Sequence, residues 1–289
     1  MLIHKLITLC VLLTFFVGCA SRTQGWMKDD SKLQLSQAEV AALETKAQSL
    51  WNRRSSKEKL MSALDVYKKL AQAKTNNYHE LVRLSRGYYF LADAHMSDEE
   101  EKRKNWEIGT SWGEKAMATN EEFAKAVKAG EDFTEHLGKL SKKEIAAMYW
   151  TATNLGKWAK STGIVTTLKY KNKIRTLIGN VEKMDAKFFY AAAYRYWGAY
   201  YAVAPSFAGG DMSKSKMYFE RSIKIAPEYL GTRVLYAQYY ATKASNPDLF
   251  KRQLKTVLSA KAEVKDIGPE NRAEQAKAKV LLANIEEQF

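Results

Sequence analysis

Apolar side chains recur at helical spacing almost without a break from Ser36 to Phe289, and this pattern constrains the fold more than any other feature of the chain. Side chains three and four positions apart lie on one face of a helix, so each such stretch predicts a helix with one buried face. The 289 residues include only four prolines and 15 glycines, and no stretch keeps the alternation of a half-buried strand. We therefore expect an all-α fold.

The same spacing predicts a single folded domain over residues 36–289. The helical period of apolar residues weakens over 120–140, where Gly130 and Gly138 interrupt it. We expect an irregular connection there between a front and a back group of hairpins. The expected helices cover residues 36–53, 56–74, 78–96, 98–119, 141–160, 165–182, 187–203, 211–226, 229–244, 247–260 and 270–288.

The stretch 194–229 predicts how these helices pair. Tyr194, Trp197 and Gly198 share one helix face, as in the first helix of a tetratricopeptide unit, and the second helix ends at Pro227 as that unit's second helix usually does. Such hairpins cannot bury their apolar faces alone, so we expect a right-handed superhelix of stacked hairpins with a C-terminal capping helix. The expected pairs are 86–90 with 113–116, 150–158 with 165–182, 194–201 with 219–227, and 236–240 with 249–258.

Residues 1–18 have the layout of a signal peptide. A charged start with Lys5 precedes the apolar run 6–17, which is too short to cross a bilayer because a spanning helix takes about 20 residues. The sequence FVGC resembles a bacterial lipobox, so we expect an acyl anchor on Cys19; an ordinary secretory signal and a retained short anchor are the alternatives. Ala20 is not the aspartate of the enteric sorting rule, and this favours the outer membrane, with the body facing the periplasm.

Residues 19–35 are polar apart from Trp26, and they predict a flexible tether that would span about 20–24 Å as a coil. Cleavage would remove Lys5 and Cys10, which leaves 45 basic against 32 acidic residues and Cys19 as the single cysteine. The excess of basic charge fits anionic lipid or an acidic partner, whereas export argues against nucleic acid. Solvated helix faces remain the simplest interpretation, because no run reaches five basic residues.

Residues suited to catalysis or metal binding are sparse. Asp132 and His136 lie four positions apart, but a solvated pair explains them better than a metal site does. Gly209, Gly210 and Asp211 could form an anion-binding turn, although a tight turn followed by a helix N-cap is the simpler interpretation. We expect no enzyme, no catalytic residue, no metal and no cofactor.

Aromatic side chains carry the remaining functional signal. Trp150, Asn154 and Trp158 repeat every four residues along one helix face. This stripe is either hairpin core or the wall of a groove in which Arg195 would bind a carboxylate or an acidic peptide. The loop 205–211 is longer than a standard repeat requires, and insertions often mark the binding face. The candidate ligand- or partner-binding residues are Trp150, Asn154, Trp158, Arg195, Phe207, Gly209, Gly210 and Asp211.

Six segments follow the lipoprotein signal in order: RGYYFLADA, AAMYWTATNLGKWAK, YRYWGAYYAVAPSFAGGDMSKSKMYFERSI, VLYAQYYA, LFKRQLKTVLSA and ENRAEQAKAKVLL. Together they resemble the T component associated with TRAP transporters, the TatT family. Arg86 and Ser222 depart from the general repeat, which more often has a leucine-like residue and an alanine at these positions.

The resemblance implies an all-α periplasmic lipoprotein that forms a homo-oligomer with a central passage and engages the transporter's solute-binding protein. It also implies solutes that are small organic acids. We therefore predict a tethered scaffold that binds a TRAP-type solute-binding protein, its small organic-acid ligand, or both. The alternative is a generic tetratricopeptide lipoprotein that serves as a scaffold in outer-membrane or cell-envelope assembly.

Overall fold

The computed structural model describes residues 22–29 and 31–289. This part of the chain is helical and contains no β-strand, which confirms the all-α prediction; the expected signal peptide and Cys19 lie outside it. The α-helices are α1 (Gln37–Asn52), α2 (Lys57–Ala73), α3 (Tyr78–His95), α4 (Glu99–Met117), α5 (Glu121–Lys128), α6 (Ile145–Thr162), α7 (Ile164–Met184), α8 (Phe188–Val203), α9 (Met212–Ile225), α10 (Gly231–Leu235), α11 (Pro247–Ser259) and α12 (Gly268–Ala283). The shorter turns are η1 (Gly25–Met27), η2 (Phe133–Lys139), η3 (Lys142–Glu144), η4 (Ser206–Ala208), η5 (Tyr236–Ala241) and η6 (Ile285–Glu287).

Polar side chains fix where several helices begin. Ser36 starts α1 with the predicted capping box, since its hydroxyl accepts from the N–H of Glu39 and the Glu39 carboxylate accepts from the N–H of Ser36. The side chains of Asp98 and Asn120 cap α4 and α5 by accepting from the N–H groups of Glu101 and Phe123. Each cap satisfies an N–H group that the first helical turn leaves without a partner.

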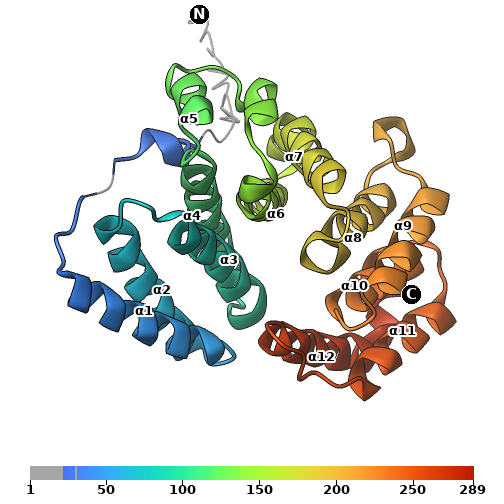
Figure 1. Ribbon diagram of the computed structural model, residues 1–289. Coiled ribbons are helices and arrows are strands. Elements are labelled where there is room, and N and C mark those ends of the chain that lie inside the picture. The colour runs from blue at the N-terminus through green and yellow to red at the C-terminus, as the bar shows by residue number, and fades with distance from the viewer. Residues whose placement is uncertain (1–21, 30) are drawn as a thin grey trace, which may run out of the picture.

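The helices follow one another around an arch whose last member returns to the early ones (Figure 1). α3 packs with α4, α6 with α7, α8 with α9, and η5 with α11, which confirms the four predicted pairs. α1 and α2 precede these pairs, and α2 packs against α3. α12 contacts α10 and α11 and also reaches α3.

Three segments differ from the sequence prediction. Residues 120–140 are more regular than expected, because they form α5, which buries Phe123 and Val127, and the 3-10 helix η2. The helix expected over 229–244 divides into α10 and the π-helical turn η5. α8 begins with a turn of left-handed backbone at residues 189–191.

Two hydrophobic cores fill the arch. The front core extends from Trp26 to Trp197 and takes its buried side chains from the helices up to α8. The back core extends from Phe219 to Ala278 and lies among α9, α10, η5, α11 and α12. The boundary between the two cores therefore lies between α8 and α9, and not at residues 120–140 where the sequence predicted the division into a front and a back group.

Gly198 lets α9 approach α8, as the sequence predicted. A Cβ atom at Gly198 would lie 2.7 Å from the ring of Phe219, closer than side chains tolerate. The Ser215 hydroxyl donates to the carbonyl oxygen of Gly198 at 2.7 Å. The front and back cores meet across this close contact.

α12 closes the arch through ion pairs with α3 and with Arg54, which lies between α1 and α2. Glu270 accepts from Arg54 at 2.6 Å and from Arg86 at 2.7 Å, and all three side chains are buried or nearly so. Lys277, two turns further along α12, donates to Asp93 of α3 at 2.5 Å. The expected capping helix is thus present, but its polar face points toward the front helices instead of covering an open end.

Residues 22–27 correct the prediction of a flexible tether over 19–35. Arg22, Gly25 and Trp26 are buried against α4, α5 and η2, on the side of the molecule where the chain enters (Figure 1). The physical reason is that Trp26 has two aromatic partners, Phe123 and Phe133, at centroid distances of 5.8 and 5.7 Å. This segment therefore belongs to the folded body.

None of the helices among the described residues is both long and apolar enough to cross a membrane.

Candidate functional site

The tryptophan stripe of α6 is core and does not line a groove. Trp150, Asn154 and Trp158 are all buried. Asn154 donates to the backbone carbonyl of Ser85 at 3.0 Å and lies against Gly109 of α4, where a Cβ atom would come within 2.4 Å of its Oδ1. The groove interpretation is therefore wrong for these side chains, because the packing of neighboring helices buries the whole stripe.

Arg195 is buried as well, with only 4% of its surface exposed. Its guanidinium donates to the carbonyl oxygens of Tyr190 at 2.7 Å and Phe189 at 3.0 Å, and to the Tyr149 hydroxyl at 3.2 Å. It also lies 4.0 Å from the ring centroid of Tyr229. All these partners are neutral, so Arg195 brings a positive charge into the interior without a carboxylate of its own.

The carbonyl groups that Arg195 binds belong to a strained turn. Phe189, Tyr190 and Ala191 have φ angles of 41°, 59° and 55°, and a left-handed conformation costs about 1–2 kcal/mol per non-glycine residue. Ser222 donates to the Ala191 carbonyl at 3.3 Å, which accounts for a serine at this repeat position. Strain of this kind persists only where the surroundings hold it, and it occurs often at functional sites.

The loop 205–211 does not join this group. Gly209 has a φ of 94°, and Asp211 accepts from the N–H of Lys214 at 3.0 Å, so the turn and N-cap interpretation is confirmed. Gly210 approaches the carbonyl of Ala204 so closely that a Cβ atom would clash at 1.9 Å. Phe207, at the opposite end of α8 from the strained turn, is 91% exposed. The loop is an ordered protrusion separate from the other candidate residues.

An ionic group that the sequence did not reveal lies on the inner sides of α3, α6 and α12. Asp93 accepts from Lys157 at 2.8 Å and from Lys277 at 2.5 Å, and Lys277 also donates to Glu274 at 3.0 Å. The side chains of Lys157 and Lys277 keep 34% and 33% of their surface exposed, whereas Asp93 keeps only 15%. Both ammonium groups therefore still face solvent although their shared carboxylate is largely covered.

These contacts keep all three side chains charged near neutral pH. Burial alone would raise the pKa of Asp93, but the charges of Lys157 and Lys277 outweigh it and hold that pKa well below its usual range. Burial would lower the pKa of each lysine, yet the charge of Asp93 raises both. A neighboring anion would meet two fully protonated ammonium groups.

Arg86, which pairs with Glu270, lies against the aromatic side chains around the strained turn. Its guanidinium lies 5.6 Å from the centroid of Trp150 and 4.9 Å from that of Phe189, while it pairs with Glu270. This position explains why an arginine replaces the usual leucine-like residue of the repeat. We call the whole set the central cluster; it comprises Arg54, Arg86, Asp93, Tyr149, Trp150, Lys157, Phe189, Arg195, Tyr229, Glu270, Glu274 and Lys277.

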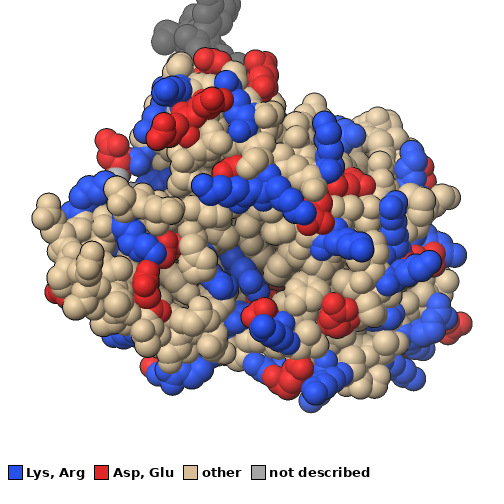
Figure 2. All heavy atoms as spheres, in the orientation of Figure 1, with Lys and Arg blue, Asp and Glu red and all other residues tan. Residues whose placement is uncertain are grey.

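The central cluster has more basic than acidic side chains. It contains five basic and three acidic residues. The space-filling view shows this face of the molecule hollowed near its center, with Lys or Arg atoms lying in the hollow (Figure 2). Arg86 also has a buried Nε atom without a hydrogen-bond partner among the described residues. The arrangement suits an anion with an apolar part.

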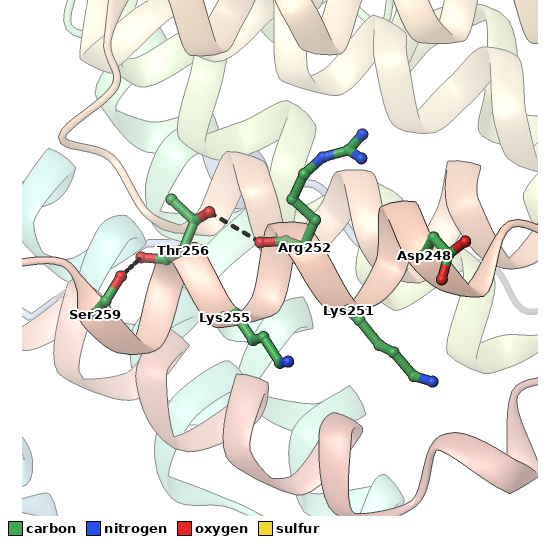
Figure 3. Close-up of a pocket in the computed structure, with 6 residues that line it drawn as sticks. All are labelled: Asp248, Lys251, Arg252, Lys255, Thr256 and Ser259. Atoms are coloured by element: carbon green, nitrogen blue, oxygen red, sulfur yellow. Dashed lines mark hydrogen bonds between the residues drawn. The ribbon is translucent and has the colours of Figure 1, made fainter.

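A second hollow, on the outside of α11, is less suited to a ligand. Lys251 and Lys255 point to one side of the helix and Arg252 to the other, so the three cations do not converge (Figure 3). The hydroxyl groups of Thr256 and Ser259 donate to backbone carbonyls of their own helix. This surface is a solvated helix face.

The described residues offer no cluster of three or more metal-ligating side chains. Asp132 accepts from Lys173 at 2.9 Å and caps η2, while His136 pairs with Glu131. Asp132 and His136 therefore each contact a different residue instead of forming the predicted solvated pair.

A family model described as TRAP transporter T-component matches residues 56–289. A search among curated proteins found no match. The matched range includes every residue of the central cluster except Arg54 and leaves out the docked segment 22–27.

Proposed function

This chain belongs to the TRAP transporter T-component family, and from that premise we propose that it binds a small organic acid in its central cluster and docks a solute-binding protein of the TRAP system. It would act as a binding component in solute uptake and not as an enzyme. The family links the chain to TRAP transporters; the ligand and the direct protein partner are our proposal.

One observation carries the ligand part of the proposal: the central cluster has five basic side chains and only three acidic ones. Arg54 and Arg86 share the single carboxylate of Glu270, and Arg195 has only neutral acceptors. A buried cation without a compensating anion is costly, so a bound carboxylate would relieve that cost. The exposed third of each lysine side chain in the cluster provides access for it.

The aromatic side of the cluster supports a ligand with an apolar part. Tyr149, Trp150 and Phe189 pack together with centroid distances of 4.9–5.8 Å. Small-molecule sites usually combine apolar walls with a few converging polar groups. A short carboxylic acid with a hydrocarbon or aromatic tail matches both properties better than a sugar or a cation does.

Calorimetric titration with a series of monocarboxylates of increasing tail length tests this site. We expect binding by the natural protein and an affinity roughly ten- to a hundredfold lower for Lys277→Met, since hydrogen bonds to charged groups contribute about 1.5–3 kcal/mol. Lys255→Met on α11 is the matched control and should bind normally. Equal binding by both variants, or no binding by the natural protein, would contradict the proposed site.

The protein partner requires a separate experiment. The full chain, used as bait in solubilized envelope, should capture a solute-binding protein or a membrane subunit of a TRAP transporter, identified by mass spectrometry. Recovery of neither would count against docking. A deletion strain with a weakened envelope and normal organic-acid uptake would favor the alternative, a scaffold in envelope assembly.

Anchoring, location and assembly complete the proposal. We propose an acyl chain on Cys19, the outer membrane as its site, a body facing the periplasm, and a homo-oligomer. Exposed apolar side chains at the start of α7, Ile164, Val165 and Leu168, support a contact between copies. Light scattering of the natural protein and of Leu168→Asp tests the oligomer; a monomer in both cases would exclude it under those conditions.

A further inference from the structure

The N-terminal segment is attached to the body by buried charge. Arg22 donates to both carboxylate oxygens of Glu114, at 2.5 and 2.9 Å, and to the Ser111 hydroxyl at 2.9 Å. The backbone N–H of Gly25 donates to the same carboxylate at 2.6 Å. Bidentate pairs of this kind fix orientation as well as position. Residues 22–25 are thus held at one defined place on α4.

Shape complementarity adds to this attachment. A Cβ atom at Gly25 would lie 1.9 Å from the carbonyl oxygen of Ser111, so the backbone of the segment lies directly on α4. Trp26, 8% exposed, fills the space between Phe123 of α5 and Phe133 of η2. Releasing the segment would expose these rings and leave Glu114 buried without its partner.

The attachment shortens the link between the body and the acyl anchor proposed at Cys19. Only three residue steps separate Cys19 from Arg22, and a fully extended chain covers at most about 11 Å in three steps. The headgroup layer on one side of a bilayer is itself about 5–8 Å thick. Crossing that layer uses most of the available length, so the end of the body near Arg22 must come to the membrane surface.

We propose that residues 22–27 lock the α5–η2 end of the protein against the headgroups of the membrane that holds its anchor. This surface, the membrane-facing end, consists of α5, η2 and η3. The inference rests on the proposed acylation of Cys19. α11 and α12 lie at the far end of the arch from α5 and therefore point away from the membrane, toward soluble partners (Figure 1).

The surface charge of the membrane-facing end distinguishes the proposed contact from electrostatic adsorption of the protein to anionic lipid. The exposed side chains of residues 121–143 include five acidic and five basic groups, although the whole chain carries a net charge of +14. A balanced surface gains little from anionic lipid. The lock therefore predicts that the membrane-facing end stays at the headgroups in neutral lipid and at high salt.

Spin labels placed at the two ends of the acylated full-length protein test the inference. Lys128→Cys labels α5 and Lys255→Cys labels α11, and each protein is reconstituted in phosphatidylcholine nanodiscs that contain a nickel-chelating lipid. We expect strong relaxation enhancement by headgroup nickel at position 128 and none at position 255. High salt should not change this difference.

Two variants release the segment in different ways. Gly25→Leu introduces the clash with α4, and Glu114→Gln weakens the hold on Arg22, so one variant remains if the other does not fold. Both should reduce the enhancement at position 128 severalfold, because a free tether of about 16 residues spans about 20–24 Å. Gly138→Ala in η2 is the matched control, since its Cβ atom would meet open space.

The outcomes separate this inference from the proposed anchor. Equal enhancement at the two positions, or an enhancement at position 128 that survives in folded Gly25→Leu and Glu114→Gln proteins, overturns the lock alone. Enhancement that requires anionic lipid also overturns it, in favor of adsorption. An intact mass without an acyl chain on Cys19 overturns both the anchor and the lock.

Discussion

The back helices of this protein, α9 to α12, meet the front helices at two joints that differ in construction. At the first joint, Gly198 of α8 accommodates the ring of Phe219, and the two hydrophobic cores come together. At the second joint, α12 returns to α3 through Arg86–Glu270 and Asp93–Lys277. One joint is apolar and closely packed, whereas the other is ionic and partly exposed to solvent.

This difference assigns separate roles to the two joints. Apolar packing is indifferent to pH and to small anions, so the first joint can hold the two halves together under all conditions. The stability that an ion pair contributes depends on the protonation of its groups and on nearby charges, so the second joint should respond to pH and to the anion proposed to bind there. The central cluster lies at the joint that can respond.

The largest expected effect comes from breaking the ionic joint. Glu270→Gln leaves Arg54 and Arg86 buried without their carboxylate, which should lower the free energy of unfolding by about 3–5 kcal/mol. Urea unfolding of the purified protein measures it. Glu263→Gln, which loses only the exposed pair with Arg272, serves as control and should change stability little. Similar values for both variants would mean that the second joint contributes nothing to stability.

Overpacking tests the apolar joint. Gly198→Leu forces a side chain against the Phe219 ring and should cost about 3 kcal/mol, the upper end of the usual range for overpacked cores. Thermal unfolding should show a lower midpoint. Gly179→Ala on α7 meets open space and should leave stability unchanged or slightly higher. An unchanged midpoint for Gly198→Leu would exclude the close approach of α8 and α9.

Arg195→Met tests whether the region next to the apolar joint also depends on polar contacts. The substitution leaves the carbonyl oxygens of Phe189 and Tyr190 without their charged donor, at a cost of about 1.5–3 kcal/mol. Arg195 also belongs to the proposed binding site, so the same substitution should weaken ligand binding. Chemical denaturation combined with ligand titration measures both effects, and unchanged stability would contradict the structural role of Arg195.

The smallest effect is the pH response of the ionic joint. The pKa values of Asp93 and Glu270 lie below their unfolded values near 4, so their contribution is complete above about pH 5 and is lost as pH falls through the folded pKa values. The pKa values of Lys157 and Lys277 are raised, so their contribution is complete below about pH 10 and is lost at higher pH. Hydrogen exchange in α3 and α12 should rise at both extremes before exchange in α8 and α9 does.

The two joints also differ in how well the sequence predicted them. A glycine among aromatic residues is a local pattern, so the pairing of α8 with α9 followed directly from spacing. Asp93 and Lys277 are each charged residues on otherwise ordinary helices, and nothing near either one indicates a partner 184 positions away. Long-range ion pairs carry no periodic signal, and the central cluster was missed for this reason.

The candidate site shows the same limit. Trp150, Asn154 and Trp158 were correctly placed on one helix face, but their spacing is identical for a core stripe and a groove wall. Burial depends on which helix covers that face, and here Gly109 allows α4 to do so. Residues 22–27 were predicted to be part of a tether because six residues with one tryptophan cannot show which surface they bind.

The return of α12 to α3 also affects the order in which parts of the chain fold and the place where the native structure opens first. Both ion pairs at this joint connect residues 184 positions apart, whereas each helical hairpin connects near neighbors. Local hairpins form early, and a contact of such long sequence separation forms late. We therefore expect the packing of α12 against α3 to be the final folding step. The last contact to form is commonly the first to open in the native state. Brief opening there would admit a solute to the central cluster while both hydrophobic cores stay folded.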